Sequence, residues 1–141
     1  MKGQVVLFAW RQGIEYGKSP KAACMIMSVL ANRVKNGWGT WMDVLETAPK
    51  YAAHPYVTEG TPDLWDEGFT QLLHEVDTIY AGSQNYALSA PPKNLGYVLP
   101  PVPALYWADT RRITTQFFQQ KIQFNPEHPR IGDMNTLTLY A

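Results

Sequence analysis

The 141 residues carry twelve basic and twelve acidic side chains, so the formal net charge is zero. Charged residues make up only 17% of the chain while aromatic residues reach 13%, which excludes intrinsic disorder and favours one compact domain over 1–141. A nucleic-acid-binding protein usually carries a basic excess, and a transmembrane helix needs about 20 apolar residues. Neither nucleic acid nor a membrane is therefore expected as a partner.

Two long helices are predicted in the first quarter of the chain. Apolar residues on nearly every side predict a largely buried helix over roughly 3–16. The second helix is expected over 19–36, where apolar residues recur three and four positions apart. Ser19 is a good N-cap, Pro20 suits the first helical position, and Gly37 can adopt the left-handed conformation that ends a helix.

The next segment combines a short helix with a long loop. Thr40 is expected to cap a helix over 41–46. Prolines and glycines interrupt any periodicity from 47 to 62, and an irregular loop of this length is uncommon unless it has a function. Three of its side chains are expected to line a groove: Tyr51, His54 and Tyr56.

A third long helix is predicted from Asp63 to Ala81. His74 and Asp77, three positions apart on this helix, are interpreted as solvent-facing residues rather than as a metal or acid–base pair. Residues 83–103 are rich in proline and are expected to form an extended loop with apolar anchors. The predicted buried face of the helix comprises Leu64, Phe69, Leu72, Leu73, Val76, Ile79 and Tyr80. The anchors of the loop include Leu95, Tyr97 and Leu99.

The C-terminal part predicts strands and one more helix. A short strand is expected over 104–108, and the alternation of polar and apolar residues over 136–140 predicts a second strand that pairs with it. Thr114 or Thr115 is expected to cap a helix between them. The predicted fold is therefore mainly α (α+β), with a small C-terminal β-hairpin or two-stranded sheet.

Glu15 is the first candidate for a catalytic role. It falls in the predicted turn before the second helix, near the C-terminal end of the first. The exposed carbonyl groups there, and an apolar neighbour such as Trp10 or Tyr16, are expected to disfavour its ionised form. A glutamate that is partly protonated near neutral pH suits a general acid. The alternative interpretation is a solvated surface carboxylate.

The order of these features resembles a known family. Glu15, a short turn with Gly17 and a helix that ends in Asn-Arg-Val over 32–34 are similar to the cell-wall hydrolase family of the spore-cortex-lytic (SleB) type. Residues 104–107 and 131–140 resemble the late strands of that family, so the resemblance covers most of the chain. It implies a single lysozyme-like domain, peptidoglycan as the substrate and Glu15 as the catalytic residue of a muralytic enzyme, often a lytic transglycosylase.

The chain departs from the family pattern at two places. The turn after Glu15 is one residue shorter than usual and carries Lys18 where the family has a second glutamate. Lys50-Tyr51-Ala52 stands where the family has Gln-Phe-Ser. Hydrolysis of a glycoside usually needs two carboxylates, whereas a lytic transglycosylase can use one, because a hydroxyl of the sugar itself attacks. With one carboxylate singled out, transglycosylation is the preferred expectation.

Further candidates complete the predicted site. Asp109 is the favoured second carboxylate because it follows a strand end. Glycan sites combine aromatic platforms with polar groups, so Tyr51, Tyr106 and Trp107 are candidates, although aromatic residues more often belong to the core. Asn32 is a polar candidate that can instead tie its helix to a loop. The predicted substrate-binding residues are therefore Tyr51, Tyr106, Trp107, Asn32 and Asp109.

The sequence predicts no cofactor and no metal, because it has no phosphate-binding loop and its histidines lack ligand spacing. Its single cysteine, Cys24, is interpreted as a core residue. Arg11 interrupts the apolar N-terminal run and no cleavage site follows it. The chain is therefore expected to be made in a host cytoplasm without its own signal peptide, and to act at the bacterial cell wall or within a virion. The alternative function is a phage virion structural or assembly protein without activity, bound to other virion or tail proteins.

Overall fold

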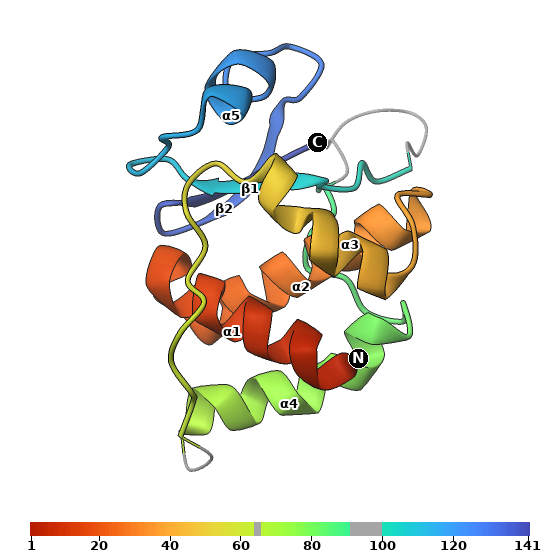
Figure 1. The fold of residues 1–141 in the computed structure, drawn as a ribbon. Coiled ribbons are helices and arrows are strands. Elements are labelled where there is room, and N and C mark those ends of the chain that lie inside the picture. Colours follow the sequence, from red (N-terminus) through yellow and green to blue (C-terminus); the bar gives the residue numbers. More distant parts are fainter. Residues whose placement is uncertain (64–65, 91–99) are drawn as a thin grey trace.

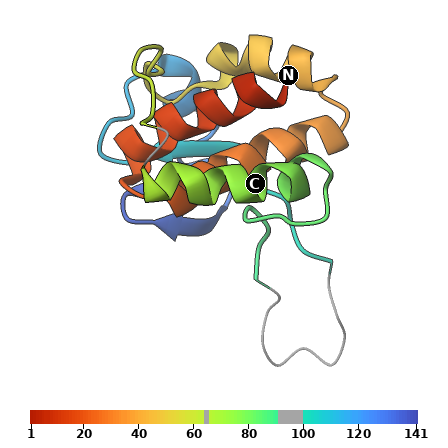
Figure 2. The same ribbon diagram turned by 90° about the horizontal axis from the view of Figure 1, so that it is seen from below.

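The computed structural model describes residues 1–63, 66–90 and 100–141, which form a mainly helical fold with a small antiparallel sheet. The three long helices are α1 (Lys2–Gly17), α2 (Pro20–Lys35) and α4 (Glu67–Tyr80). They lie side by side, and Figure 1 places them on one side of the sheet. Figure 2 shows the same layer of helices from below. The mainly α (α+β) prediction is confirmed.

Side-chain caps fix where several helices begin. The Ser19 hydroxyl accepts a hydrogen bond from the backbone N–H of Lys21 at 3.0 Å, and Pro20 occupies the first turn of α2. Thr40 caps α3 (Trp41–Thr47), and Thr115 caps α5 (Gln116–Lys121). These three predicted caps are confirmed. A short 3-10 helix, η1 (Ala48–Tyr51), continues α3 and begins the loop predicted over 47–62.

The sheet has one strand more than predicted. Its strands are β1 (Tyr106–Asp109), β2 (Arg130–Met134) and β3 (Leu137–Tyr140), in the order β1-β3-β2. The predicted pairing of β1 with β3 is confirmed, since Trp107 lies opposite Leu139 in an antiparallel register. The predicted two-stranded sheet is too small, because β2 pairs with the other edge of β3.

Both faces of β1 and β3 are buried, because these two strands lie between two groups of core residues. Successive side chains of a strand point to opposite faces, so neighbours in β1 contribute to different cores. One face joins the core that α1, α2 and α4 share, through Trp107, Leu137 and Leu139. The other face packs against α5, on the opposite side of the sheet in Figure 1, through Tyr106, Ala108, Phe118, Ile122 and Tyr140.

Several other expectations can be compared with the structure. Cys24 is buried, and both His74 and Asp77 are exposed, as predicted. The prediction for Leu73 is wrong, because its side chain is 41% exposed on α4. Leu64 and the loop anchors at 91–99 lie outside the described residues. None of the helices among the described residues is long and apolar enough to cross a membrane.

Candidate active site

Glu15 lies in the last turn of α1, not in a turn between two helices. Its side chain is 45% exposed, and its Oε1 atom is 2.7 Å from an Nη atom of Arg112. Arg112 belongs to the connection between β1 and α5, so this ion pair joins the helical layer to the sheet. The two residues are 97 positions apart in the sequence.

The same guanidinium also faces Asp109, the last residue of β1. Its Nε atom is 3.6 Å from Asp109 Oδ2, and the side chain of Asp109 is fully buried. The other oxygen of Asp109 accepts a hydrogen bond from the backbone N–H of Arg111 at 3.1 Å. Glu15 and Asp109, both predicted as site residues, are therefore brought together around one cation.

Two stacked aromatic rings, those of Tyr16 and His54, pack beside the cluster of Glu15, Arg112 and Asp109. The rings of Tyr16 and His54 are stacked with their centroids 3.8 Å apart, and the hydroxyl of Tyr16 donates to the backbone carbonyl of Pro55. His54 is buried, and its Nε2 atom accepts a hydrogen bond from the backbone N–H of Asp109 at 3.0 Å. Trp107 lies 5.3 Å from His54 by ring centroids. The loop that holds His54 is thereby attached to the end of β1.

The ionisation predicted for Glu15 is wrong. The hydrogen bond from Arg112 lowers the pKa of Glu15 below its usual value, and the positive charge of Lys18 acts in the same direction. Desolvation by burial acts the other way, but a half-exposed side chain in an ion pair is little desolvated. In the free protein Glu15 is therefore a charged carboxylate at neutral pH.

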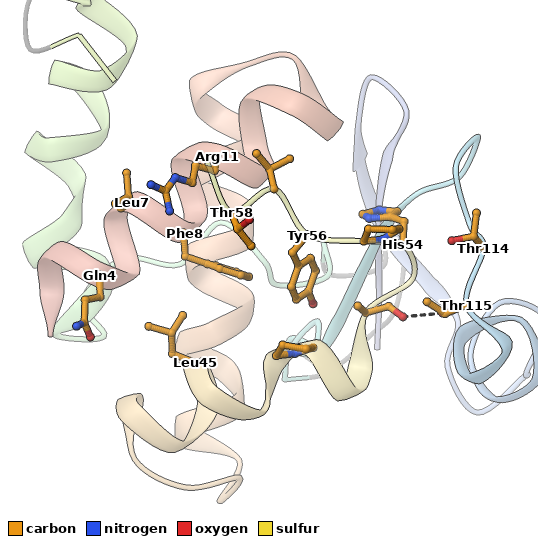
Figure 3. Close-up of a pocket in the computed structure, with 14 residues that line it drawn as sticks. Gln4, Leu7, Phe8, Arg11, Leu45, His54, Tyr56, Thr58, Thr114 and Thr115 are labelled. Atoms are coloured by element: carbon orange, nitrogen blue, oxygen red, sulfur yellow. Dashed lines mark hydrogen bonds between the residues drawn. The ribbon is translucent and has the colours of Figure 1, made fainter. Parts of the chain in front are cut away.

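Two hollows adjoin this cluster. The larger one, of about 640 Å³, lies between α1, η1 and the loop that follows it, and Figure 3 shows its lining. Its walls are mostly apolar, with Phe8 and Tyr56 on one side and His54 and Thr115 near the sheet. The smaller one, of about 190 Å³, is lined by Glu15 itself. Arg11 and Val57 line both hollows, so the two are neighbours.

The other predicted substrate-binding residues lie elsewhere or inside the core. Tyr51 and Tyr106 surround the buried guanidinium of Arg33, whose central carbon is 5.5 and 5.7 Å from their ring centroids. Trp107 does lie next to the Tyr16–His54 stack, but it is only 3% exposed. A substrate role for these three aromatic residues stays a prediction.

Asn32 ties α2 to a distant loop. Its side-chain amide donates to the carbonyls of Ala87 and Ala104 at 3.0 and 2.9 Å. Its oxygen accepts from the amide of Asn85 at 2.6 Å, and the residue is buried. Asn32 therefore ties its helix to a loop, as the alternative interpretation expects. A contact of Asn32 with substrate stays a prediction.

We expect the substitution Asn32→Ala to lower the free energy of unfolding by about 2–4 kcal/mol, because it leaves buried polar groups of the loop without a partner. Urea denaturation of the purified protein measures this loss. Asn36→Ala is the matched control, since Asn36 is exposed just after the same helix. Equal stability of the two variants would contradict the prediction.

Stability should also depend on the protonation of His54. Burial lowers the pKa of this imidazole, because desolvation disfavours its charged form. Below the ordinary value of 6.5, the unfolded chain therefore binds a proton that the folded protein resists. The stability contributed by neutral His54 is complete at pH values above the ordinary pKa. It is lost as the pH falls from that value toward the lower pKa of His54 in the folded protein.

Urea denaturation at pH 7.5 and 5.5 tests this dependence. The parent protein should lose stability over this interval, and the variant His54→Gln should lose clearly less. His74→Gln removes an exposed histidine from α4 and should keep the full loss. A His54→Gln variant with the same pH dependence as the parent would refute the assignment.

Two members of the cluster were not singled out as site residues by the sequence. In the sequence Arg112 is one half of an Arg-Arg pair with Arg111, and no motif marks it. His54 is expected only to line a groove in its loop. The signal that points to Arg112 is its position. It is a cation shortly after Asp109, the candidate carboxylate at the end of a predicted strand.

Comparisons of the chain with known protein families, with curated proteins and with solved structures gave no match. The resemblance to cell-wall hydrolases therefore depends on the residues quoted above.

Proposed function

We propose that the chain is a peptidoglycan-cleaving glycosidase that acts on the β-1,4 glycan strand as a lytic transglycosylase, with Glu15 as its acid and base. One observation carries the proposal. Glu15 presents a solvent-accessible carboxylate at the end of α1, beside two neighbouring hollows and facing a cation that a second carboxylate also contacts. Such a carboxylate can reach a glycosidic oxygen of a bound glycan.

The position of Asp109 favours transglycosylation over hydrolysis. A hydrolase needs a second carboxylate that activates water or attacks the sugar. The side chain of Asp109 is fully buried, and Arg112 lies next to it, so it has no direct access to such a water. In a lytic transglycosylase Glu15 alone protonates the leaving oxygen and then takes the proton of the attacking sugar hydroxyl.

The charge of Glu15 sets a condition on this mechanism. Glu15 must carry a proton when the glycosidic bond breaks, whereas its ion pair with Arg112 favours the ionised form. A glycan that covers Glu15 and separates it from Arg112 would remove the stabilising cation and desolvate the carboxylate. Both changes raise the proton affinity of Glu15. The proposal therefore includes displacement of Arg112 by the substrate.

A second candidate is a phage virion structural or assembly protein that keeps a lysozyme-like fold without activity. The ion pair itself favours this candidate, since it holds Glu15 in the form that cannot donate a proton. In either case we propose that the chain acts at the bacterial cell wall or within a virion.

Digestion of purified peptidoglycan followed by mass spectrometry of the soluble fragments tests the proposal. Anhydro-muropeptides would support a lytic transglycosylase. Fragments with reducing ends would mean hydrolysis and a second catalytic group. Absence of fragments, together with stable co-purification with a tail or capsid protein, would favour the virion protein.

A further inference from the structure

We infer that Arg112 is a positioning residue for Glu15, which fixes the carboxylate at the end of α1 in the free protein and releases it when glycan binds. This inference rests on the proposed function and adds a second residue to it. Arg112 does not contact the reacting atoms. Its side chain is called the latch below, because it holds Glu15 until the substrate displaces it.

Three contacts hold the guanidinium in place. One Nη atom is 2.7 Å from Glu15 Oε1, and Nε is 3.6 Å from Asp109 Oδ2. The central carbon of the guanidinium also lies 5.4 Å from the centroid of the Tyr16 ring, within range of a cation–π contact. Because Tyr16 follows Glu15 on α1, two of the three contacts attach Arg112 to the end of that helix.

The backbone that carries Arg112 is fixed independently of Glu15. The backbone N–H of Arg112 donates to the carbonyl of Asp109 at 2.9 Å, which closes a turn directly after β1. The N–H of Asp109 donates to His54, and the N–H of Thr114 donates to the carbonyl of Ala53 at 2.9 Å. The side chain of Arg112 can therefore leave Glu15 without unfolding the turn that supports it.

The latch is able to open because it lies at the surface. The side chain of Arg112 is 42% exposed, and water competes for an ion pair of this kind, so its net contribution to stability is small. Asp109, in contrast, is buried and cannot follow the cation outward. A polar group of a glycan strand that binds the guanidinium can therefore compete with Glu15 for it.

Release of Arg112 raises the pKa of Glu15, because the strongest effect that favours its ionised form is removed. The negative charge of Asp109 and desolvation both act to raise the pKa of Glu15, and only Arg112 and Lys18 oppose them. Removal of Arg112 takes away the strongest of the effects that lower the pKa of Glu15 and leaves the positive charge of Lys18, which acts in the same direction. Displacement of the latch thus moves Glu15 toward the form that a general acid requires. The charged and titratable groups around Glu15 are Arg11, Tyr16, Lys18, Glu59, Asp109, Arg111 and Arg112.

The experiment follows the titration of Glu15 in the whole protein by carbon NMR of its side-chain carboxyl group, in the parent and in two variants. Arg112→Gln removes the latch. Arg111→Gln is the matched control, because the neighbouring Arg111 faces Asp109 at 3.8 Å but makes no ion pair with Glu15 among the described residues. The Glu15 titration should move to higher pH in Arg112→Gln and stay in place in Arg111→Gln.

Activity supplies the second readout. The rate at which a suspension of cell walls clears is measured against pH for the same three proteins. The fall in rate at high pH reports loss of the proton from Glu15, so it should move to higher pH in Arg112→Gln only. An active parent whose Glu15 titration is unchanged by Arg112→Gln would overturn the inference alone. A parent that releases no wall fragments would overturn the proposed function and the inference with it.

Discussion

Replacing Glu15 with glutamine is expected to abolish the release of soluble fragments from peptidoglycan, with a loss of at least about 100-fold in rate. Glutamine has nearly the same shape as glutamate but cannot donate an acidic proton to a glycosidic oxygen or accept one from a sugar hydroxyl. In the proposed mechanism no other carboxylate substitutes for it, because Asp109 is buried. Mass spectrometry of the fragments measures the loss directly.

The fold should survive this substitution. Glu15 is 45% exposed and its ion pair with Arg112 is open to solvent, so the free energy of unfolding should change little. Glu127→Gln is the control, since Glu127 is exposed between α5 and β2 and lines neither hollow. It should keep the activity of the parent. Full activity in Glu15→Gln would show that Glu15 is not the acid.

Local signals in the sequence were sufficient to place the helices. Ser19, Thr40 and Thr115 each accept a backbone hydrogen bond at the start of a helix, and this interaction depends only on residues within one turn. The prediction for α4 shows the limit of such signals. Asp63 and Asp66 are both suitable caps, and the structure uses Asp66, which accepts from the N–H of Phe69 at 3.1 Å. The presence of helix α4 was therefore predicted correctly, whereas its first residue was not.

The sheet was only partly predictable, because its burial depends on distant segments. The alternation in β3 predicts a strand with one solvated face, yet Thr138 is buried with its neighbours. Helix α5 covers that face through Phe118 and Ile122, and no local pattern shows this packing. The third strand, β2, has no apolar alternation, since most of its residues are exposed at the sheet edge.

The sequence singled out Glu15 and Asp109 as site residues, but it did not predict the ionisation of Glu15. Asp109 was favoured because it ends a strand, and the structure indeed places it near Glu15. The predicted ionisation of Glu15 is wrong because its sequence neighbours do not decide it: the dominant partner is Arg112, 97 positions away. The electrostatics of a site depend on the tertiary contacts of each group, which a single sequence does not display.

A second large effect is expected on stability, from Gly13→Ala in α1. Gly13 faces Ala23 of α2 at a close approach of the two helices. A Cβ atom at this position would lie 2.5 Å from the Cα atom of Ala23 and 2.7 Å from its Cβ atom. Because the obstacle includes backbone, it cannot move aside like the end of a flexible side chain. The helices must separate, and the apolar residues between them lose contact.

We expect Gly13→Ala to lower the free energy of unfolding by about 3 kcal/mol or more, measured by urea denaturation. The opposite sign is expected for Gly3→Ala, which lies in the first turn of the same helix with no atom within 4 Å of the new Cβ. Alanine favours the helical conformation there by up to about 1 kcal/mol. The same chemical change thus separates helix propensity from helix packing. Stabilisation by both substitutions would mean that α1 and α2 do not approach each other as closely at Gly13 as described. Because Glu15 lies half a turn beyond Gly13, the spacing of these helices also determines where the proposed acid meets Arg112.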